Sequence, residues 1–512
     1  MAGVDCLPIE VNILTLNCWG IPYVSQDRSS RLEEIGRHIV KAKPQPHIVG
    51  LQECFSRKDF ERIQQETCSI LPYFKQYFAG PLGAGLVLLS RWPIEETSMT
   101  RYPLNGSPTA FSHSDWYAGK GIAYARVRYG KEPDNVIDVF NTHMHAFYPG
   151  NEYICHRASQ AWELSKLLRA ASRRRHGRAL VVLLGDLNAE PTSLPYRILK
   201  HFVPDLHDTW PQHKKNPGNN REIGDVQREH ADIQNGVTYG SPYNTWMWTR
   251  GQRARYLGQP ATPTSELVLP AEVGQEQAVR IDYVLASVAP LRLDPSTDEI
   301  GGGKDVGNTR SSNHGCGVWV VKAAKVGMTD RHPVLGCSLS DHFSVETTLM
   351  FQPVERGVSE SQKLIDEPSG SGPDIFTRPK SATSSKAPIQ EVHGASISGE
   401  LLGETGTIGL LDEILHVLDD YNKVLRQRAW WRVRLGVAST VLVGSLAGVW
   451  VVNGPGWARL VLSLSGALAS AFVALDTWGG LSLRPTEMAA LAEFEWEVGN
   501  AKRGRDGGTD LS

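Results

Sequence analysis

The segment LVVLLGDLNAEP, residues 180–191, is the feature that most constrains the fold. Five successive apolar residues, 180–184, indicate a strand buried on both faces, which stops at Gly185 and places Asp186 and Asn188 at its carboxyl end. Because residues two apart on a strand face the same side, these two side chains are predicted to lie together. A carboxylate beside an amide can hold a water or a metal next to a phosphate. The alternative is a plain turn, in which Asp and Asn are common.

Composition limits the classes of protein that fit. A chain of 512 residues suggests roughly two to four domains, although a single two-sheet domain could use ~300 residues. The 53 basic and 55 acidic side chains give a net charge of -2, which removes any global electrostatic case for nucleic-acid binding. The seven cysteines are scattered without a CxxC pair, so a reducing, cytosol-facing catalytic part is favoured over a disulfide framework or a structural zinc site. The first residues show no cleaved signal peptide.

Two earlier strands also end in polar side chains. Residues 11–17 predict a strand that ends at Asn17, and residues 47–52 predict a buried strand with Glu53 at its end. A helix is predicted between them, so the two strands can lie side by side and bring Asn17 and Glu53 together. Taken alone, Glu53 could equally be a solvated acid at a strand end.

The segment VIDVFNTHMHA, residues 136–146, ends another apolar run with His143 and His145 on one side of the strand. A lone histidine at such a place is usually a hydrogen-bonded core residue, whereas an HxH pair could bind a transition metal. The lack of a third soft ligand nearby in the sequence argues against zinc. Residues 151–174 predict a long helix that leads into the strand before Asp186.

The second half of this region is less regular. Residues 205–280 are rich in Pro, Gly, Asn and Gln, so we expect surface excursions there. The strand AVRIDYVLA then places Asp282 between apolar neighbours, where a carboxylate requires a cation or an imidazole N–H as its partner. LGCSLSDHFSV presents Asp341 and His342 just before the last strand, with a plain turn as the alternative.

The order of these side chains along the chain is more specific than any one of them. The ordered set is Asn17, Glu53, His143, Asp186 with Asn188, Asp282, and Asp341 with His342. Over residues 9–352 it resembles the endonuclease/exonuclease/phosphatase superfamily, whose fold is the DNase I-like four-layered α/β sandwich. The motifs LNCWGIPY, GLQECF, NGSP, DWYAGKG, NTHMHA, HRASQAWEL, GDLN, RIDYVL and LSDHFSV are similar to those of the Mg-dependent neutral sphingomyelinases and their fungal relatives acting on inositol phosphosphingolipids.

The resemblance implies a catalytic centre that uses Mg²⁺, a hard cation that prefers oxygen ligands. Glu53 is then the first metal ligand, with Asn17 close by and Asp341 as a further contact. The general base for water is implied to be His342, steered by Asp282, while Asp186 helps to orient the nucleophile. How Asp186 and His342 share these tasks stays open, because coupled acid–base groups can exchange apparent roles.

Phosphate binding is implied for Asn188 and His143, and the segment DWYAGKG adds Lys120 and Asp115. The segment is not an ATP-binding P-loop, because it lacks the earlier glycine and the hydroxyl residue after the lysine that this motif requires. Lys120 is expected to contact the phosphate, with Asp115 pairing with it or releasing it. The alternative is an exposed ion pair in a mobile loop.

The composition changes sharply after residue 351. We predict a flexible linker over 353–404, an amphipathic basic juxtamembrane helix over 405–434, two transmembrane helices over 435–475, and a C-terminal helix and tail over 476–512. The two apolar segments, 435–452 and 459–475, are each close to the ~20 residues that span a bilayer, and basic residues before the first place the catalytic domain in the cytosol. The alternatives are a buried hairpin of a soluble domain and a tilted or re-entrant second segment.

The resemblance implies a phosphodiesterase of the phospholipase C type that acts in sphingolipid catabolism, and the predicted C-terminal hairpin implies that it is anchored in a membrane. Its substrates would be sphingomyelin or inositol phosphosphingolipids, cleaved to ceramide and a phosphorylated headgroup, in the endoplasmic reticulum, mitochondrial or plasma membrane. Anionic phospholipid is the expected activator, no nucleic acid is expected as a partner, and the oligomeric state stays open. The alternatives are an inactive membrane scaffold, and a nuclease or phosphoinositide phosphatase, which the neutral charge and the predicted hairpin disfavour.

Overall fold

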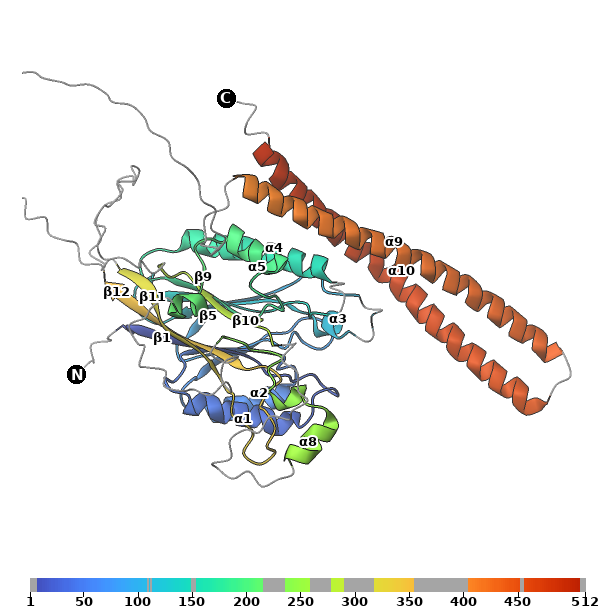
Figure 1. Cartoon of the computed structure of the whole chain (residues 1–512), viewed down its shortest axis with the longest axis horizontal. Helices are drawn as coiled ribbons and strands as arrows, with labels where there is room; N and C mark the ends of the chain where they lie inside the picture. Colours follow the sequence, from blue (N-terminus) through green and yellow to red (C-terminus); the bar gives the residue numbers. More distant parts are fainter. Residues whose placement is uncertain are drawn as a thin grey trace, which may run out of the picture.

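Two six-stranded sheets packed face to face form the centre of the molecule (Figure 1). The computed structural model describes residues 7–107, 110, 113–148, 153–214, 235–257, 278–289, 317–353, 404–451 and 455–506. In spatial order, the first sheet contains β11 (Gly317–Gly327), β12 (Ser344–Pro353), β1 (Glu10–Asn17), β2 (Ile48–Gln52), β4 (Val87–Ser90) and β3 (Tyr73–Gln76). The second contains β5 (Ile94–Arg101), β6 (Gly121–Arg128), β7 (Val136–His143), β8 (Leu180–Asp186), β10 (Asp282–Ala286) and β9 (His207–Asp208).

Helices cover the outer face of each sheet and complete four layers. Apolar residues of α1 (Arg28–Lys41) and α2 (Arg57–Thr67) pack on the first sheet, and those of α4 (Ile154–Arg174) and α5 (Leu194–Phe202) pack on the second. The other helices described within 7–353 are short: α3 (Asp115–Ala118), α6 (Thr209–Lys214), the 3-10 helix η4 (Thr245–Met247) and α8 (Arg250–Leu257). The observed layers confirm the predicted four-layered sandwich.

Strand β8 shows why its sequence is an uninterrupted apolar run. Val182 and Leu184 point into the core between the two sheets, whereas Val181 and Leu183 point into the core beneath α4 and α5. Both faces of the strand are therefore buried, and the period-2 alternation of polar and apolar residues is lost.

Strand direction explains why polar side chains gather at one edge. β1 and β2 are parallel, as are β7 and β8, so their carboxyl ends lie together. Asn17 pairs in register with the residue before Glu53, which confirms the predicted neighbourhood of these two side chains. β10 is antiparallel to β8 and begins where β8 ends, which pairs Asp282 with Asp186.

Residues 236–248 are buried or half-buried, so the prediction of surface excursions is wrong for this stretch, whereas residues 249–251 are exposed as predicted. Thr238, Asn244 and Trp248 are almost fully buried. Asn244 Nδ2 donates to the carbonyl of Ser340 at 2.9 Å, so it satisfies a backbone group just before Asp341. The polar residues that suggested a solvated loop instead hold the segment that carries Asp341 and His342.

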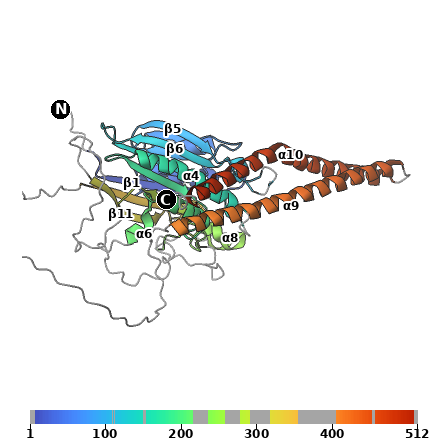
Figure 2. The same ribbon diagram turned by 90° about the horizontal axis from the view of Figure 1, so that it is seen from above.

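The chain ends in two long helices, α9 (Glu404–Val451) and α10 (Gly456–Asp506), which lie alongside each other and project from the sandwich (Figures 1 and 2). Their ends nearest the sandwich pack on α4 and α5, where Leu411, Ile414 and Phe494 share one buried cluster with Trp162 and Phe202. Residues 405–434 are helical as part of α9, which continues unbroken to Val451, and the juxtamembrane role of this helix stays a prediction.

No helix in the described part of the chain has both the length and the apolar character needed to cross a membrane. The predicted pair of transmembrane helices at 435–475 is therefore not supported. The predicted linker lies outside the described residues, apart from its two end residues, 353 and 404.

Candidate active site

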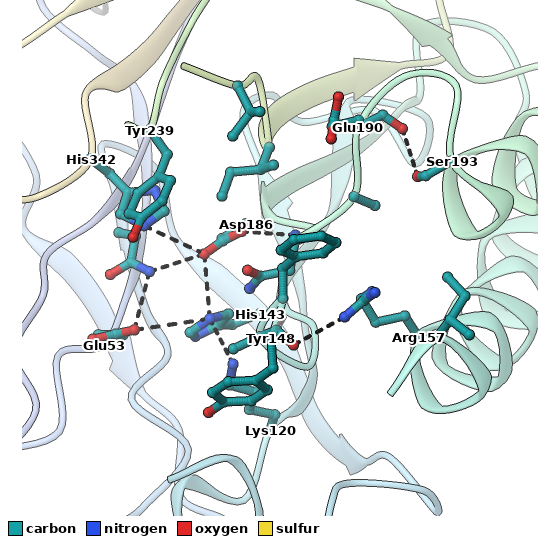
Figure 3. Close-up of a pocket in the computed structure, with 18 of the residues that line it drawn as sticks. Glu53, Lys120, His143, Tyr148, Arg157, Asp186, Glu190, Ser193, Tyr239 and His342 are labelled. Atoms are coloured by element: carbon teal, nitrogen blue, oxygen red, sulfur yellow. Dashed lines mark hydrogen bonds and ion pairs between the residues drawn. The ribbon is translucent and has the colours of Figure 1, made fainter. Parts of the chain in front are cut away.

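His143, Asp186 and Asp282 stand in one row across three neighbouring strands, β7, β8 and β10. Asn17 reaches this row from the other sheet: its Nδ2 donates to Asp186 Oδ2 at 3.0 Å and to Glu53 Oε1 at 3.3 Å (Figure 3). Asp186 is therefore the point at which side chains from both sheets meet, and it is almost fully buried.

His342 and Asp282 form a second pair beside Asp186. His342 Nδ1 lies 2.8 Å from Asp282 Oδ2, and the other ring nitrogen, Nε2, lies 3.9 Å from Asp186 Oδ2. This imidazole is the partner that a buried Asp282 requires. Burial alone would lower the pKa of His342, but Asp282 and the nearby Asp341 and Asp186 raise it to about 10. Asp282 fixes the ring so that Nε2 is directed toward Asp186.

Three acids lie close together in this buried setting, and their pKa values are raised. Burial and the charge of Asp341 raise the pKa of Glu53 to about 7, and burial and the charge of Asp282 raise that of Asp186 to about 6. Burial also raises the pKa of Asp341. A cation among these carboxylates would offset the repulsion that raises their pKa values.

The oxygen atoms fit a hard divalent cation. Glu53 Oε2 is buried and has no hydrogen-bond partner among the described residues, and Asn17 and Asp341 also line the cavity beside it. Distance alone favours a different trio, since one ligand atom each of Asp186, Asp282 and His342 lies within 4.8 Å of the others. In that trio Asp282 Oδ2 is bonded to His342 and orients its ring, whereas Asp282 Oδ1, like Glu53 Oε2, has no partner among the described residues. Glu53 lines the cavity and Asp282 lies behind that lining, so Glu53 is the better-placed ligand.

Lys120 and Asp115 form a buried ion pair, with 2.6 Å between Nζ and Oδ1. The alternative of an exposed pair is therefore wrong. Lys120 Nζ also lies 2.9 Å from His143 Nε2 and donates to the carbonyl of Met144 at 2.8 Å. Burial and the charge of Lys120 hold the pKa of His143 well below its usual value, so this ring is neutral. His143 Nε2 lies 3.3 Å from Asp186 Oδ2, which links the ion pair to the centre of the site.

Asn188 reaches the site through a turn. β8 ends at Asp186, and Asn188 has a φ of 44°, a left-handed conformation that asparagine tolerates better than most residues. Its backbone N–H donates to Asp186 Oδ1 at 2.9 Å, and its Nδ2 donates to the Met144 carbonyl at 3.1 Å. The two interpretations of GDLN are therefore compatible, because a turn places both polar side chains in the site.

His145 does not join His143. β7 ends at His143, and beyond it the ring of His145 stacks on Tyr153 with 4.3 Å between the ring centroids. Its Nδ1 lies 3.0 Å from the Ala146 carbonyl. The HxH spacing therefore forms no shared metal site, because the strand periodicity that would align the two rings has already ended.

One cavity of about 960 Å³ receives most of the predicted residues. Eight of them line it: Asn17, Glu53, Lys120, His143, Asp186, Asn188, Asp341 and His342. Asp115 and Asp282 lie behind this lining and contact it through Lys120 and His342. The structure thus brings all ten predicted residues into one site.

Three further lining residues were missed by the sequence analysis. The ring of Tyr239 lies 4.9 Å from that of His342, Tyr148 Oη donates to Asp115 Oδ2 at 2.7 Å, and Arg157 donates to the Ala146 carbonyl at 3.0 Å. None of them follows an apolar strand, which was the signal used. For Arg157 the motif HRASQAWEL was a usable signal, since it places a charged residue on a face of α4 that is otherwise buried.

The fold and the cavity define a hydrolase of phosphate esters. The chain belongs to the Endonuclease/Exonuclease/phosphatase family, which its residues 14–342 match. Inositol phosphosphingolipids phospholipase C of Schizosaccharomyces pombe is 35% identical over 370 residues, covering 70% of this chain and 74% of that protein. Sphingomyelin phosphodiesterase 2 of Homo sapiens is 32% identical over 204 residues, covering 40% of this chain and 46% of that protein. Truncated TDP2 of Caenorhabditis elegans, a solved structure, aligns at a TM-score of 0.41 and 17% identity over 67% of this chain and 98% of its own.

Proposed function

We propose that this enzyme is a phosphodiesterase of the phospholipase C type that cleaves sphingophospholipids to ceramide and a phosphorylated headgroup, with Mg²⁺ as its cation. The position of Asp186 carries the proposal. Its Oδ2 lies 3.0 Å from Asn17 Nδ2, 3.3 Å from His143 Nε2 and 3.9 Å from His342 Nε2. Such a carboxylate, at the wall of a cavity and within reach of a base, can orient a water against a phosphorus atom.

Each of these residues has a separate role in the reaction. Water forms a bond to phosphorus through its oxygen, His342 Nε2 accepts its proton, and the bond from phosphorus to the ceramide oxygen breaks. Asp282 stabilises the imidazolium that forms, since it already accepts from Nδ1. The departing ceramide oxygen takes up a proton from solvent on the opposite side of phosphorus, and the imidazolium returns its proton to solvent before the next cycle.

The phosphate itself needs donors. Lys120 lines the cavity and supplies positive charge, and because its three N–H groups are already engaged within the protein, donation to the phosphate would replace one of those contacts. Asn188 also lines the cavity and supplies an amide N–H. When bound by Glu53 with Asn17 and Asp341, Mg²⁺ would neutralise charge on the phosphoryl oxygens and, by opposing the carboxylates around His342, favour the neutral form of that ring.

The sphingophospholipid class rests on the relatives. A fungal phospholipase C for inositol phosphosphingolipids and a human sphingomyelin phosphodiesterase both align with this chain, and the fungal alignment covers most of both proteins. The two substrates share a ceramide phosphodiester and differ in headgroup, so the shared diester defines the proposed substrate.

We further propose that the projecting half of α9 and α10 contacts a lipid surface. Its described residues expose large apolar side chains, among them Trp430, Trp457 and Leu468, with 52%, 73% and 73% of their surfaces accessible. Arg434 lies over the ring of Trp430, with Cζ 3.1 Å from the ring centroid. Exposed tryptophans and leucines next to arginines are typical of segments that bind at a membrane interface rich in anionic lipid.

The test is release of a water-soluble phosphorylated headgroup from mixed micelles by the purified full chain. We expect release from sphingomyelin or from inositol phosphosphingolipid with Mg²⁺, and none with EDTA. Parallel assays with plasmid DNA and with a phosphoinositide address the competing activities. Cleavage of either of these two substrates without cleavage of a sphingophospholipid would overturn the proposal.

A further inference from the structure

We infer that α9 completes the substrate site: Val417, together with Ile154 and Leu194, forms a wall that holds the apolar part of the lipid beside the phosphodiester. This inference rests on the proposed function, since it assigns a place to the ceramide portion of a sphingophospholipid.

The cavity has two sides of different character. One side carries the carboxylates and histidines, and the opposite side is formed by the first turns of α4 and α5 and by α9. Figure 3 shows this division, with Glu53 on one side of the cavity and Arg157 and Ser193 on the other. Val417 and Glu413 of α9 both line the second side. A segment that begins beyond residue 403 therefore contributes directly to the cavity that contains Asp186.

The position of α9 is fixed by its packing on the sandwich. Leu410, Leu411, Ile414, Leu418 and Tyr421 lie on one stripe of the helix and are buried against α4 and α5. Val417 lies one turn beyond Glu413, so the two side chains occupy neighbouring places along the edge of this stripe. Both are half-buried, as expected for residues between the packed stripe and the cavity.

Polar contacts hold the helix beside the mouth of the cavity. Glu413 forms a salt bridge with Arg197 of α5, and both residues line the cavity. Thr407 Oγ1 lies 2.9 Å from His201 Nε2, nearly two turns nearer the start of α9. These contacts join α9 to α5 at two places along the helix. They therefore fix the position of Val417 relative to the cavity.

The apolar character of this wall suits a lipid chain more than a headgroup. Ile154, Leu194 and Val417 present hydrocarbon, and the charged pair Arg197–Glu413 is neutralised within itself. α9 then runs without interruption from Val417 to the exposed Trp430, thirteen residues on, which is about 20 Å along a helix. The same helix therefore connects the wall to the segment proposed to touch lipid, which gives the ceramide portion a route from the surface to the site.

The test compares Val417→Trp with His416→Trp in the purified full chain. His416 is the neighbouring residue on the solvent side of α9, with 76% of its side chain exposed, so the control adds the same ring to the same helix without entering the cavity. Three substrates are used with Mg²⁺: a long-chain sphingophospholipid in mixed micelles, a short-chain analogue with the same headgroup, and bis(p-nitrophenyl) phosphate. Thermal melting of each variant checks folding. If Val417→Trp does not fold, Val417→Asn, which changes polarity more than size, is tested in its place.

We expect Val417→Trp to lower kcat/KM on the long-chain lipid about tenfold or more, while the two smaller substrates are turned over at near wild-type rates. His416→Trp should behave as wild type on all three. Equal kcat/KM of the two tryptophan variants on the long-chain lipid would overturn the inference, as would an equal loss on all three substrates. Failure of the proposed function has a different signature: the wild-type enzyme would hydrolyse bis(p-nitrophenyl) phosphate and neither sphingolipid.

Discussion

Asn17 and Asp186 come from opposite sheets, and the Asn17 amide donates to the Asp186 carboxylate at 3.0 Å. The contact also places Asn17 between Asp186 and Glu53, with 3.3 Å to the latter. The two sheets must therefore pack in one register for the site to form, because a shift of either would separate Asp186, the carboxylate proposed to orient water, from Glu53, the one proposed to bind the cation.

The first prediction concerns Glu53. Because burial and Asp341 raise its pKa to about 7 from the ordinary 4.5, the folded, metal-free protein holds a proton that the unfolded chain releases. The stability of the metal-free protein should therefore fall as pH rises between those two values. Mg²⁺ should restore the melting temperature above that range. Glu53→Gln should show a smaller fall, because the pKa values of Asp186 and Asp341 are also raised, and little restoration by Mg²⁺.

Melting temperatures in EDTA and in Mg²⁺, at about pH 5 and about pH 8, test this prediction. Glu61→Gln, on the exposed face of α2, is the matched control and should follow the wild type. Glu53→Gln should also lose most of its activity at both pH values. A Mg²⁺-dependent rise in melting temperature that persists in Glu53→Gln would remove Glu53 from the metal site.

The second prediction concerns the pair His342 and Asp282. His342→Ala should lower kcat by more than ~100-fold, the lower end of the range for general acid–base catalysis, while the exposed His176→Ala should have no effect. Asp282→Asn should also be strongly impaired. Since Asp282 raises the pKa of His342, its neutralisation should move the acid limb of the rate profile to lower pH.

Profiles of kcat/KM against pH at saturating Mg²⁺ measure this shift. An acid limb at the same pH in wild type and Asp282→Asn would mean that another group controls it, with Asp186 the next candidate.

The third prediction concerns Lys120 and Asp115. Because Lys120 also contacts His143 and the Met144 carbonyl, Lys120→Ala should lower turnover strongly, and Asp115→Ala should misplace the same ammonium group. The double variant should therefore lose less than the sum of the two single losses in activation free energy. The exposed pair Arg57–Glu61 provides a control cycle, in which all effects should be small. Additive losses at Lys120 and Asp115 would show that they act independently.

The fourth prediction concerns lipid activation. Replacing Arg426, Arg428, Arg432 and Arg434 by Gln should weaken activation by anionic phospholipid and its sensitivity to salt, while the Mg²⁺ dependence is kept. Turnover is measured against the mole fraction of anionic lipid. Arg173, Arg174 and Arg175, at the exposed end of α4, offer a control triple variant that should respond as wild type does. Equal curves for the quadruple variant and the wild type would exclude a role for the cluster.

Strand ends were the part of the site that the sequence could predict. A buried strand must be apolar along its length, so the first polar residue after it marks a sheet edge, and Asn17, Glu53, His143 and Asp186 were found in this way. The order of the strands in each sheet could not be predicted in this way. Hydrophobic periodicity shows where a strand lies in the sequence, but it does not show which strands are neighbours or whether they are parallel.

Contacts between distant loops could not be predicted in the same way. Tyr239 enters the site from a segment whose composition is that of a surface loop. Contacts of its neighbours, such as the hydrogen bond from Asn244 to the Ser340 carbonyl, show how this segment is held against the site. The packing of α9 was missed for a related reason. Leu411 and Ile414 form an amphipathic stripe that is compatible with a membrane surface or with another helix, and the partner helix α4 lies more than two hundred residues earlier.

The bond from Trp162 to Glu497 joins residues 335 positions apart and has a consequence for synthesis. A ribosome makes α4 and α5 long before it makes α9 and α10, so the apolar surface around Trp162 and Phe202 is complete, and uncovered, before the two helices that cover it have been translated. Until residue 498 has emerged, the nascent sandwich presents this surface to whatever is near it. Closure of this layer of the core therefore has to wait for α10, and removal of α10 should leave the apolar surface of α4 and α5 uncovered.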